Sequence, residues 1–154
     1  MKKLLMFIAV FMIATNAQAG QEGVGLGIIL GEPTGLSFKM WRNDKEAVDA
    51  AAAWSFLDHA SFQVHADYLV HPVNIKLSDV KGRLLCYWGV GGRLRLQDAN
   101  GGNSLFGIRV PLGVSLLFSK APVELFAEVV PILDLIPRTD VSLNAAVGAR
   151  YYFK

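Results

Sequence analysis

Residues 141–153 read Val-Ser-Leu-Asn-Ala-Ala-Val-Gly-Ala-Arg-Tyr-Tyr-Phe, and every odd-numbered position in this stretch is aliphatic or aromatic. Most of the even-numbered positions carry small or polar side chains, among them Ser142, Asn144 and Arg150. In a β-strand successive side chains point to opposite faces, whereas a helix repeats its apolar positions every three or four residues. The stretch therefore predicts a long β-strand with one apolar face and one polar face.

The same alternation recurs in seven other parts of the chain. It covers residues 24–28, 36–40, 48–56, 62–70, 84–96, 106–116 and 123–129. Gly, Pro, Asn and Asp, which favour turns, separate most of these segments. Eight amphipathic strands with short connections predict an all-β fold, in which the strands close into an antiparallel up-and-down barrel.

Two prolines interrupt this pattern. Pro111 and Pro131 fall inside predicted strands, and proline has no backbone N–H to donate to a neighbouring strand. In a closed barrel every strand has two neighbours, so we expect a β-bulge at each proline. Residues 57–61 and 71–81 are interpreted as connections whose boundaries are less clear than the others.

The first 19 residues contain the three parts of a secretory signal peptide in order. Lys2 and Lys3 precede an apolar run that ends at Ala14, and a small-x-small cleavage site ends at Ala19. The apolar run is too short to cross a bilayer as a helix. We therefore expect export through a cleavable signal peptide, with residues 20–154 forming the barrel domain.

The composition excludes several classes of protein. Hydrophobic residues make up 53% of the 154 residues and charged residues 18%, below the roughly 25% usual in soluble domains. Removing the two signal-peptide lysines from the 15 basic residues leaves 13, equal to the 13 acidic residues. Without a basic stripe, no nucleic acid partner is expected. Cys86 is the only cysteine, which excludes an internal disulfide.

Alternation alone does not say which face points into the barrel. A soluble barrel of the lipocalin type holds an apolar ligand inside, whereas a membrane barrel has lipid outside and polar groups within. The apolar face carries no charged residue in any predicted strand, and the polar face is rich in Gly and Ala. A charge at the bilayer midplane costs about 2–4 kcal/mol, and small residues fit the narrow interior of eight strands. We therefore predict a transmembrane barrel with the charged face inside.

The charges of the polar face balance, five basic against five acidic. A buried charge needs a partner, so we predict that they form, together with one histidine, a lumen charge cluster with a structural role. The cluster consists of Lys39, Asp49, His65, Asp67, Arg93, Arg95, Arg109, Glu124, Glu128, Asp134 and Arg150. The alternative is that these residues line a narrow ion channel.

Large aromatic residues lie near the ends of the predicted strands, on the apolar face. They are Trp54, Phe56, Phe62, Phe106, Phe118, Tyr151 and Phe153. In membrane barrels the two lipid–water interfaces are flanked by girdles of aromatic residues. The positions of these side chains therefore favour a barrel surrounded by lipid.

A signal peptide, eight amphipathic strands and the closing residues 147–153 resemble the small OmpA/OmpX-type barrels of bacterial outer membranes. Residues 25–37, 109–114 and 128–134 also resemble a bacterial family of small outer-membrane barrels, a likeness that brings no activity with it. The resemblance covers nearly the whole mature chain. It implies an outer-membrane location and lipid as the surroundings of the barrel.

The resemblance also implies a partner during assembly. In such barrels the assembly machinery reads a C-terminal strand that ends on an aromatic residue, and here that strand ends with Tyr151, Tyr152 and Phe153. Lys154 follows the last aromatic residue, which departs from the family pattern. The departure either weakens the insertion signal or is tolerated.

Two groups of residues have the composition of a hydrolytic site. His65 and Asp67 share one strand face, and Ser55 or Ser115 would complete a triad. Residues 58–61, Asp-His-Ala-Ser, form a second acid–histidine–hydroxyl group. Such groups also arise by chance, and we interpret the first as a hydrogen-bonded pair in the lumen and the second as a solvated turn. No catalytic residue is assigned.

Metal and cofactor sites are not expected either. The three histidines, His59, His65 and His71, lie six residues apart, whereas strand ligands on one face lie two apart. The sequence therefore predicts a small outer-membrane barrel with a structural or surface-interaction role, without an enzymatic activity. The alternatives are an outer-membrane lipid-modifying enzyme, a narrow channel and a soluble periplasmic lipid-binding barrel.

Overall fold

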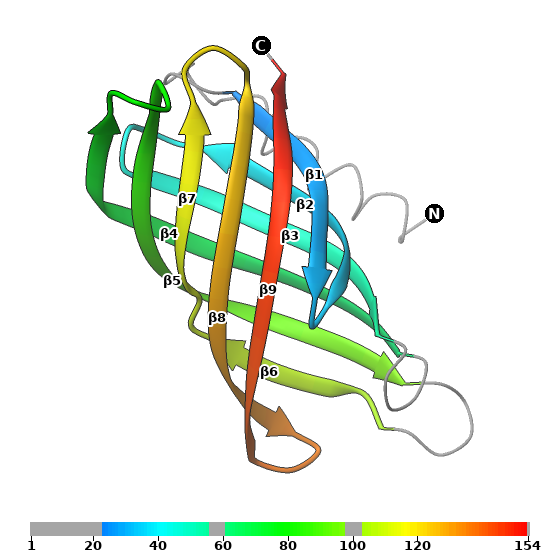
Figure 1. The fold of residues 1–154 in the computed structure, drawn as a ribbon. Helices are drawn as coiled ribbons and strands as arrows, with labels where there is room; N and C mark the ends of the chain where they lie inside the picture. The colour runs from blue at the N-terminus through cyan, green and yellow to red at the C-terminus, as the bar shows by residue number, and fades with distance from the viewer. Residues whose placement is uncertain (1–22, 56–60, 98–102, 154) are drawn as a thin grey trace.

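The computed structural model describes residues 23–55, 61–97 and 103–153, and in them the strands form one antiparallel sheet. The strands in this part of the chain are β1 (Val24–Gly31), β2 (Thr34–Trp41), β3 (Glu46–Ser55), β4 (Ser61–Leu77), β5 (Gly82–Gln97), β6 (Leu105–Arg109), β7 (Leu112–Phe118), β8 (Val123–Ile136) and β9 (Asp140–Phe153). Successive strands pair, except that β6 and β7 each pair with β5 and β8 and not with each other. β1 also pairs with β9, which closes the sheet into the barrel of Figure 1.

The nine segments make eight barrel strands. β6 and β7 both pair with β5 on one side and with β8 on the other, so they are two halves of one strand. The prediction of an all-β, eight-stranded antiparallel up-and-down barrel is therefore confirmed. The expected signal peptide, residues 1–19, lies outside the described residues.

The two ends of the barrel are distinguished by the chain termini. Val24 at the start of β1 pairs with Phe153 at the end of β9. Figure 1 shows the start of β1 and the end of β9 at the top of the barrel. The β2–β3, β4–β5 and β7–β8 turns lie at the same end, because neighbouring strands run in opposite directions. We call this the terminal end, and the opposite end, where β1 meets β2 and β8 meets β9, the loop end.

The bulges expected at Pro111 and Pro131 do not form. β8 and β9 pair without a shift in register through Pro131, and β5 keeps one register across the join between β6 and β7. The carbonyl oxygen of Pro131 accepts a hydrogen bond from Val110 N (3.0 Å), and that of Pro111 accepts one from Gly89 N (2.9 Å). Each proline lacks a backbone N–H, but its carbonyl oxygen still accepts a hydrogen bond from the neighbouring strand. The strands therefore pair without an extra residue.

A bulge does form at a different proline. The register of β4 against β5 shifts between Val70 and Val73, and Pro72 lies in this irregularity. One extra residue reverses the alternation of faces beyond it, which hides the continuation of the strand from a pattern search. The interpretation of residues 71–81 as a connection is therefore wrong for all but residues 78–81, because β4 continues through the bulge.

The two faces of the wall have opposite character. Outward side chains are apolar and exposed, as in Leu26, Val147 and Phe153, which are 49%, 55% and 52% exposed. Most inward side chains are buried, whether charged or apolar. Among the described strands the outward positions carry one charged residue, Glu46, the first residue of β3 at the terminal end. The apolar face therefore points away from the barrel.

Buried apolar side chains fill much of the lumen in two groups. The group toward the terminal end consists of Trp41, Ala47, Leu69, Leu85, Tyr87, Leu117 and Tyr152. The second group consists of Ile29, Ala51, Phe126 and Ala146. The lumen charges lie between and beside these groups.

Candidate functional site

The lumen charge cluster expected from the sequence lies on the inner face of the wall. The structure buries ten of its eleven residues, namely Lys39, Asp49, His65, Asp67, Arg93, Arg109, Glu124, Glu128, Asp134 and Arg150. The eleventh, Arg95, is half-buried near the loop end. These side chains come from seven of the eight barrel strands, and their contacts divide into three layers along the barrel.

The layer nearest the terminal end is centred on Glu124. Its Oε1 accepts a hydrogen bond from Lys39 Nζ at 2.8 Å, and its Oε2 lies 3.4 Å from Arg150 Nη1. Arg150 also contacts Asp49 Oδ2 at 3.1 Å and donates to Ser37 Oγ at 2.8 Å. Glu124 is fully buried, so the two cations supply the partners that a charge in this position requires.

Aromatic side chains enclose this layer. Tyr152 donates its hydroxyl proton to Glu124 and accepts a hydrogen bond from Trp41 Nε1 at 3.2 Å. The Lys39 ammonium lies 4.5 Å from the centre of the Trp41 ring, and the Arg150 guanidinium lies 3.8 Å from the centre of the Phe126 ring. Both distances are within the range of a cation–π contact. The terminal-end charges are thus held by rings as well as by ion pairs.

The middle layer is built around Arg109. Its Nε lies 2.9 Å from Asp67 Oδ2, and its Nη2 lies 3.4 Å from Glu128 Oε1. The hydroxyl of Tyr87 donates to the second oxygen of Glu128 at 3.0 Å. Arg109 is the last residue of β6, just ahead of the proline at 111, and it pairs with Gly91 of β5 and with Ile132 of β8. This register places the guanidinium between the two carboxylates.

The layer nearest the loop end is built around Arg93. Its Nε and Nη2 both donate to the Asp134 carboxylate, and Nη2 also donates to Ser142 Oγ at 3.2 Å. Two parallel bonds to one carboxylate form the bidentate geometry in which arginine binds most strongly. Arg95 donates to Gln63 Oε1 from two nitrogens, at 3.2 and 3.1 Å.

Inward glycines give the large side chains their room. A Cβ on Gly25 would lie 2.8 Å from the Tyr152 ring, and a Cβ on Gly113 or Gly148 would overlap the ring of Tyr87 or Phe126. Each of these glycines therefore seats an aromatic ring from another strand. The sequence shows the small residues but not their partners, because the match of glycine to ring depends on register.

The structure does not bring the first hydrolytic group together as a triad. His65 Nδ1, the Asp67 carboxylate and Ser115 Oγ make no hydrogen bond with one another. A triad needs a carboxylate bonded to one histidine nitrogen and a hydroxyl bonded to the other. The side chain of Ser55 and residues 58–60 of the second group lie outside the described residues. In the described part of the chain, no three His, Cys, Asp or Glu side chains gather as metal ligands.

The expected aromatic girdle residues lie at both ends of the outer face. Trp54, Phe106, Tyr151 and Phe153 are exposed, while Phe62 and Phe118 are half-buried. The Trp54 and Phe62 rings lie 5.6 Å apart at the loop end, and those of Tyr151 and Phe153 lie 5.1 Å apart at the terminal end. Phe56 is outside the described residues. No helix in the described residues is long and apolar enough to cross a membrane.

Comparison with known proteins supports the fold. The N-terminal β-barrel domain of Pseudomonas aeruginosa OprF matches with a TM-score of 0.65 and 13% identity, over 88% of this chain and 100% of that chain. Ail, the attachment invasion locus protein of Yersinia pestis, matches with a TM-score of 0.39 and 14% identity, over 85% of this chain and 94% of that chain. No protein-family model and no curated protein sequence matches the chain. The likeness to OprF confirms the expected OmpA-like small-barrel fold.

Proposed function

We propose that this chain is a small outer-membrane β-barrel protein with a structural or surface-interaction role and no catalytic activity. The observation that carries the proposal is the inversion of the wall, with exposed apolar side chains outside and buried, paired charges inside. Water-soluble monomers rarely expose continuous apolar patches larger than a few hundred Å². A soluble lipid-binding barrel would instead turn its apolar face toward a ligand in the lumen.

The contents of the lumen support a plug rather than an active site or a channel. Arg109, Lys39, Leu69 and Ile132 are among the largest fully buried side chains, and all of them point inward. Eight strands enclose a space that side chains just fill. We therefore assign the lumen charge cluster the role of joining opposite walls of the barrel, which makes the structure rigid.

Orientation and assembly belong to the same proposal. The terminal end, where β1 begins and β9 ends, faces the periplasm, and the loop end faces the outside of the cell. Residues 1–19 direct export and are then cleaved. Strand β9, which pairs with both β8 and β1, carries the residues that the assembly machinery reads, Tyr151, Tyr152 and Phe153.

Membrane fractionation combined with a heat-modifiability gel tests the proposal. We expect the chain in the outer-membrane fraction, and we expect unheated and boiled samples to migrate differently in detergent, because a folded barrel resists the detergent until it is heated. Recovery in the soluble periplasmic fraction, with identical migration, would contradict the proposal and favour a soluble lipid-binding barrel.

Two further measurements distinguish a structural barrel from a channel and from an enzyme. Planar bilayers containing the purified barrel are expected to show no steady conductance, and steady single-channel steps would favour the narrow channel. A His65→Ala variant is expected to leave the acyl-chain profile of lipid A unchanged relative to wild type. A profile that differs between the two would favour a lipid-modifying enzyme.

A further inference from the structure

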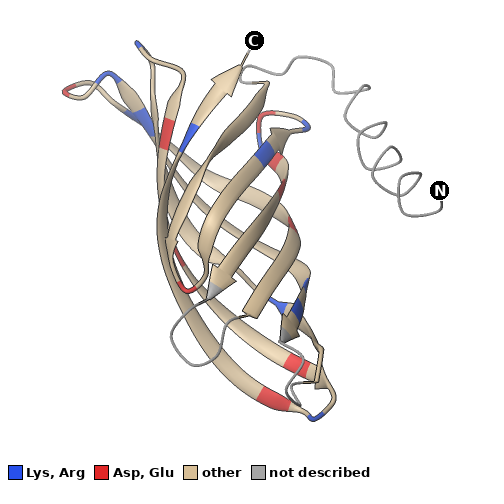
Figure 2. Ribbon diagram, turned by 90° about the vertical axis from the view of Figure 1, so that its right-hand side faces the viewer, with Lys and Arg blue, Asp and Glu red and all other residues tan. Residues whose placement is uncertain are grey.

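Charge is unevenly distributed around the terminal end of the barrel. The β2–β3 turn is balanced, with two cations, Arg42 and Lys45, and two carboxylates, Asp44 and Glu46. The exposed residues of the β4–β5 and β7–β8 turns and of the end of β4 include three cations and one carboxylate, a net charge of +2. These residues are Lys76, Asp79, Lys81 and Lys120. Figure 2 shows charged residues at the turns of this end.

The two basic turns are held side by side. Ser119 N donates to Lys81 O at 2.8 Å, and the adjacent residues Gly82 and Phe118 pair between β5 and β7. The backbone of Lys81 is therefore held beside that of the turn that carries Lys120. Cations gathered in this way create a positive potential that attracts an anion.

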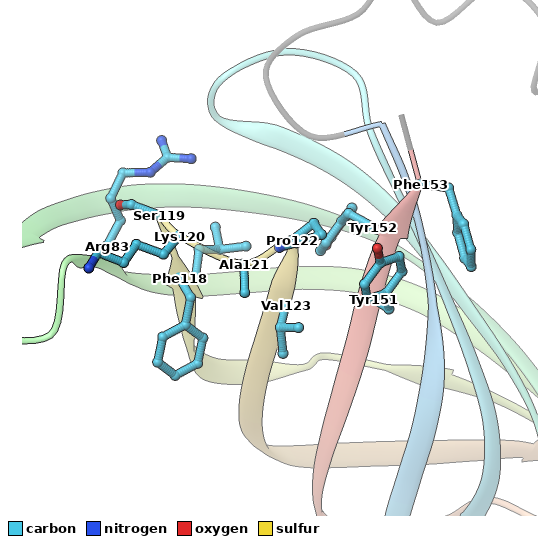
Figure 3. A pocket seen from close by; sticks show the side chains of 11 residues that line it. Arg83, Phe118, Ser119, Lys120, Ala121, Pro122, Val123, Tyr151, Tyr152 and Phe153 are labelled. Atoms are coloured by element: carbon cyan, nitrogen blue, oxygen red, sulfur yellow. The ribbon is translucent and has the colours of Figure 1, made fainter.

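Two adjoining hollows open at this place. The first has a volume of about 380 Å³ and is lined by Lys76, Leu77, Ser78, Lys81, Gly82, Arg83 and Ser119. The second, about 620 Å³, shares Arg83 and Ser119 with the first. Figure 3 shows Arg83, Ser119 and Lys120 together on one side of the second hollow and Tyr151 and Phe153 on the other. One hollow is thus rich in cations and hydroxyls, and its neighbour is lined by aromatic and aliphatic side chains.

The backbone at Lys81 suggests that a side chain at this position has a role. Its φ is 46°, in the left-handed region that glycine adopts readily and other residues adopt at a cost. If only the backbone conformation of the turn mattered, glycine or asparagine would be favoured at this position. A strained backbone conformation at a surface turn is a reason to look for a function of the side chain.

Exposed apolar side chains beside the two turns restrict the class of ligand that could bind there. Val80 at the tip of the β4–β5 turn is 49% exposed, and Tyr151 is 49% exposed on the outer wall. An acidic polymer in water would need only the cations. A glycerophospholipid needs both, because its phosphate is anionic and its glycerol and acyl chains are apolar.

We infer that the two hollows between the β4–β5 and β7–β8 turns bind an anionic glycerophospholipid of the leaflet on the terminal side of the barrel. The phosphate lies between the two turns beside Lys81 and Lys120, and the upper acyl chain lies against Phe118 and Tyr151. The site fixes the height and tilt of the barrel in the membrane by tying these two turns to the headgroup layer. This inference rests on the proposed function, since it requires a barrel in a lipid bilayer.

Titration of the folded barrel with short-chain lipids tests the inference. The protein is folded in zwitterionic dodecylphosphocholine micelles, and folding is checked first by heat-modifiable migration. Dioctanoyl phosphatidylglycerol is then added while backbone amide resonances are followed by NMR. We expect saturable shifts confined to residues 76–83, 117–123 and 151–153, and no such shifts with dioctanoyl phosphatidylcholine. Failure to fold in micelles would count against the proposed function, whereas a folded barrel without these shifts would count against the inference alone.

Matched charge variants make the test quantitative. A cation near an anionic lipid surface contributes about fivefold in affinity, so Lys81→Gln with Lys120→Gln is expected to weaken binding about 25-fold. The control, Arg42→Gln with Lys45→Gln, removes two cations from the balanced β2–β3 turn and is expected to leave the affinity unchanged. Equal weakening by both pairs would overturn the inference, because it would show a general response to net charge.

One further variant tests where the phosphate lies, and one further ligand distinguishes a lipid site from a simple anion site. Lys81→Gly relieves the left-handed backbone, so it is expected to keep or raise the unfolding midpoint while weakening phosphatidylglycerol binding about fivefold. Unchanged binding by this variant would overturn the placement of the phosphate. Inorganic phosphate is expected to give no saturable shift at the lipid concentrations used, and identical shifts with both would overturn the choice of a lipid in favour of a simple anion site.

Discussion

The inner and outer faces of this wall are made by the same strands and differ in almost every other respect. In β9, Val147 points outward and is 55% exposed, while three residues later Arg150 points inward and is 3% exposed. Outward residues make few specific contacts. Inward residues form ion pairs and ring contacts, and several aromatic rings pack closely against glycines. The outer face therefore requires only that its side chains be apolar, whereas the inner face requires particular pairs of side chains that fit one another. Substitutions are therefore expected to follow different rules on the two faces.

The largest effect is expected from removing a central lumen carboxylate. Glu124→Gln leaves Lys39 and Arg150 buried with a neutral partner, and breaking a buried pair in this way costs about 3–5 kcal/mol. Urea unfolding in phosphatidylcholine vesicles measures the loss. The control is Asp79→Asn in the exposed β4–β5 turn, where we expect a change within about 0.5 kcal/mol. Similar losses for the two variants would mean that the inner charges do not hold the barrel together.

A slightly smaller effect is expected from placing a charge on the outer face. Val147 lies in the middle of β9, opposite Leu30 and Ala127. Val147→Arg is expected to lower the free energy of unfolding in vesicles by about 2–4 kcal/mol, as for a cation at the bilayer midplane. Val147→Leu, which keeps the position apolar, is expected to change it by less than about 1.5 kcal/mol. If arginine were tolerated as well as leucine, the outer face would not meet lipid.

The smallest of the three effects is expected from adding a methyl group at a glycine, because the space around the glycine differs between the two faces. Gly25→Ala puts a methyl group against the Tyr152 ring, and overpacking of this kind costs about 1–3 kcal/mol. Gly92 faces outward, and a Cβ there would have its nearest neighbours at 3.7 and 3.9 Å, which is ordinary contact. Gly92→Ala is expected to be neutral or slightly stabilising, because glycine weakens a strand. If urea unfolding showed equal losses in the free energy of unfolding for the two variants, Gly25 would not be needed to make space for the Tyr152 ring.

The same contrast explains how far the sequence could be read. The outer face was predictable because apolarity at every second position is a local pattern, and it persists through Pro111 and Pro131. The register was less predictable, because it depends on the ladder of hydrogen bonds to both neighbours. The bulges expected at those two prolines were wrong for this reason, and the bulge at Pro72 was missed because it reverses the pattern that would reveal β4.

The lumen could be predicted as a set but not as pairs. The sequence identified the charged residues of the inner face from their parity and their balance of charge. It could not join Arg150 to Glu124, or seat Tyr152 on Gly25, because these contacts link residues distant in sequence through the register of several strands. Glycines on a polar strand face, combined with inward aromatic residues such as Tyr152 and Phe126, are the signal that could have indicated such contacts.

The central claim is that the apolar face of the barrel meets lipid and the charged face is enclosed. The most direct test is a spin-label scan along residues 143–149 of β9 in phosphatidylcholine vesicles, with Cys86 first replaced by alanine. Each position is labelled in turn, and its accessibility to oxygen, which concentrates in lipid, is compared with that to a water-soluble nickel complex. We predict high oxygen accessibility at 143, 145, 147 and 149 and low accessibility to both reagents at 144, 146 and 148. Oxygen accessibility highest at the even positions, or no alternation, would contradict the claim.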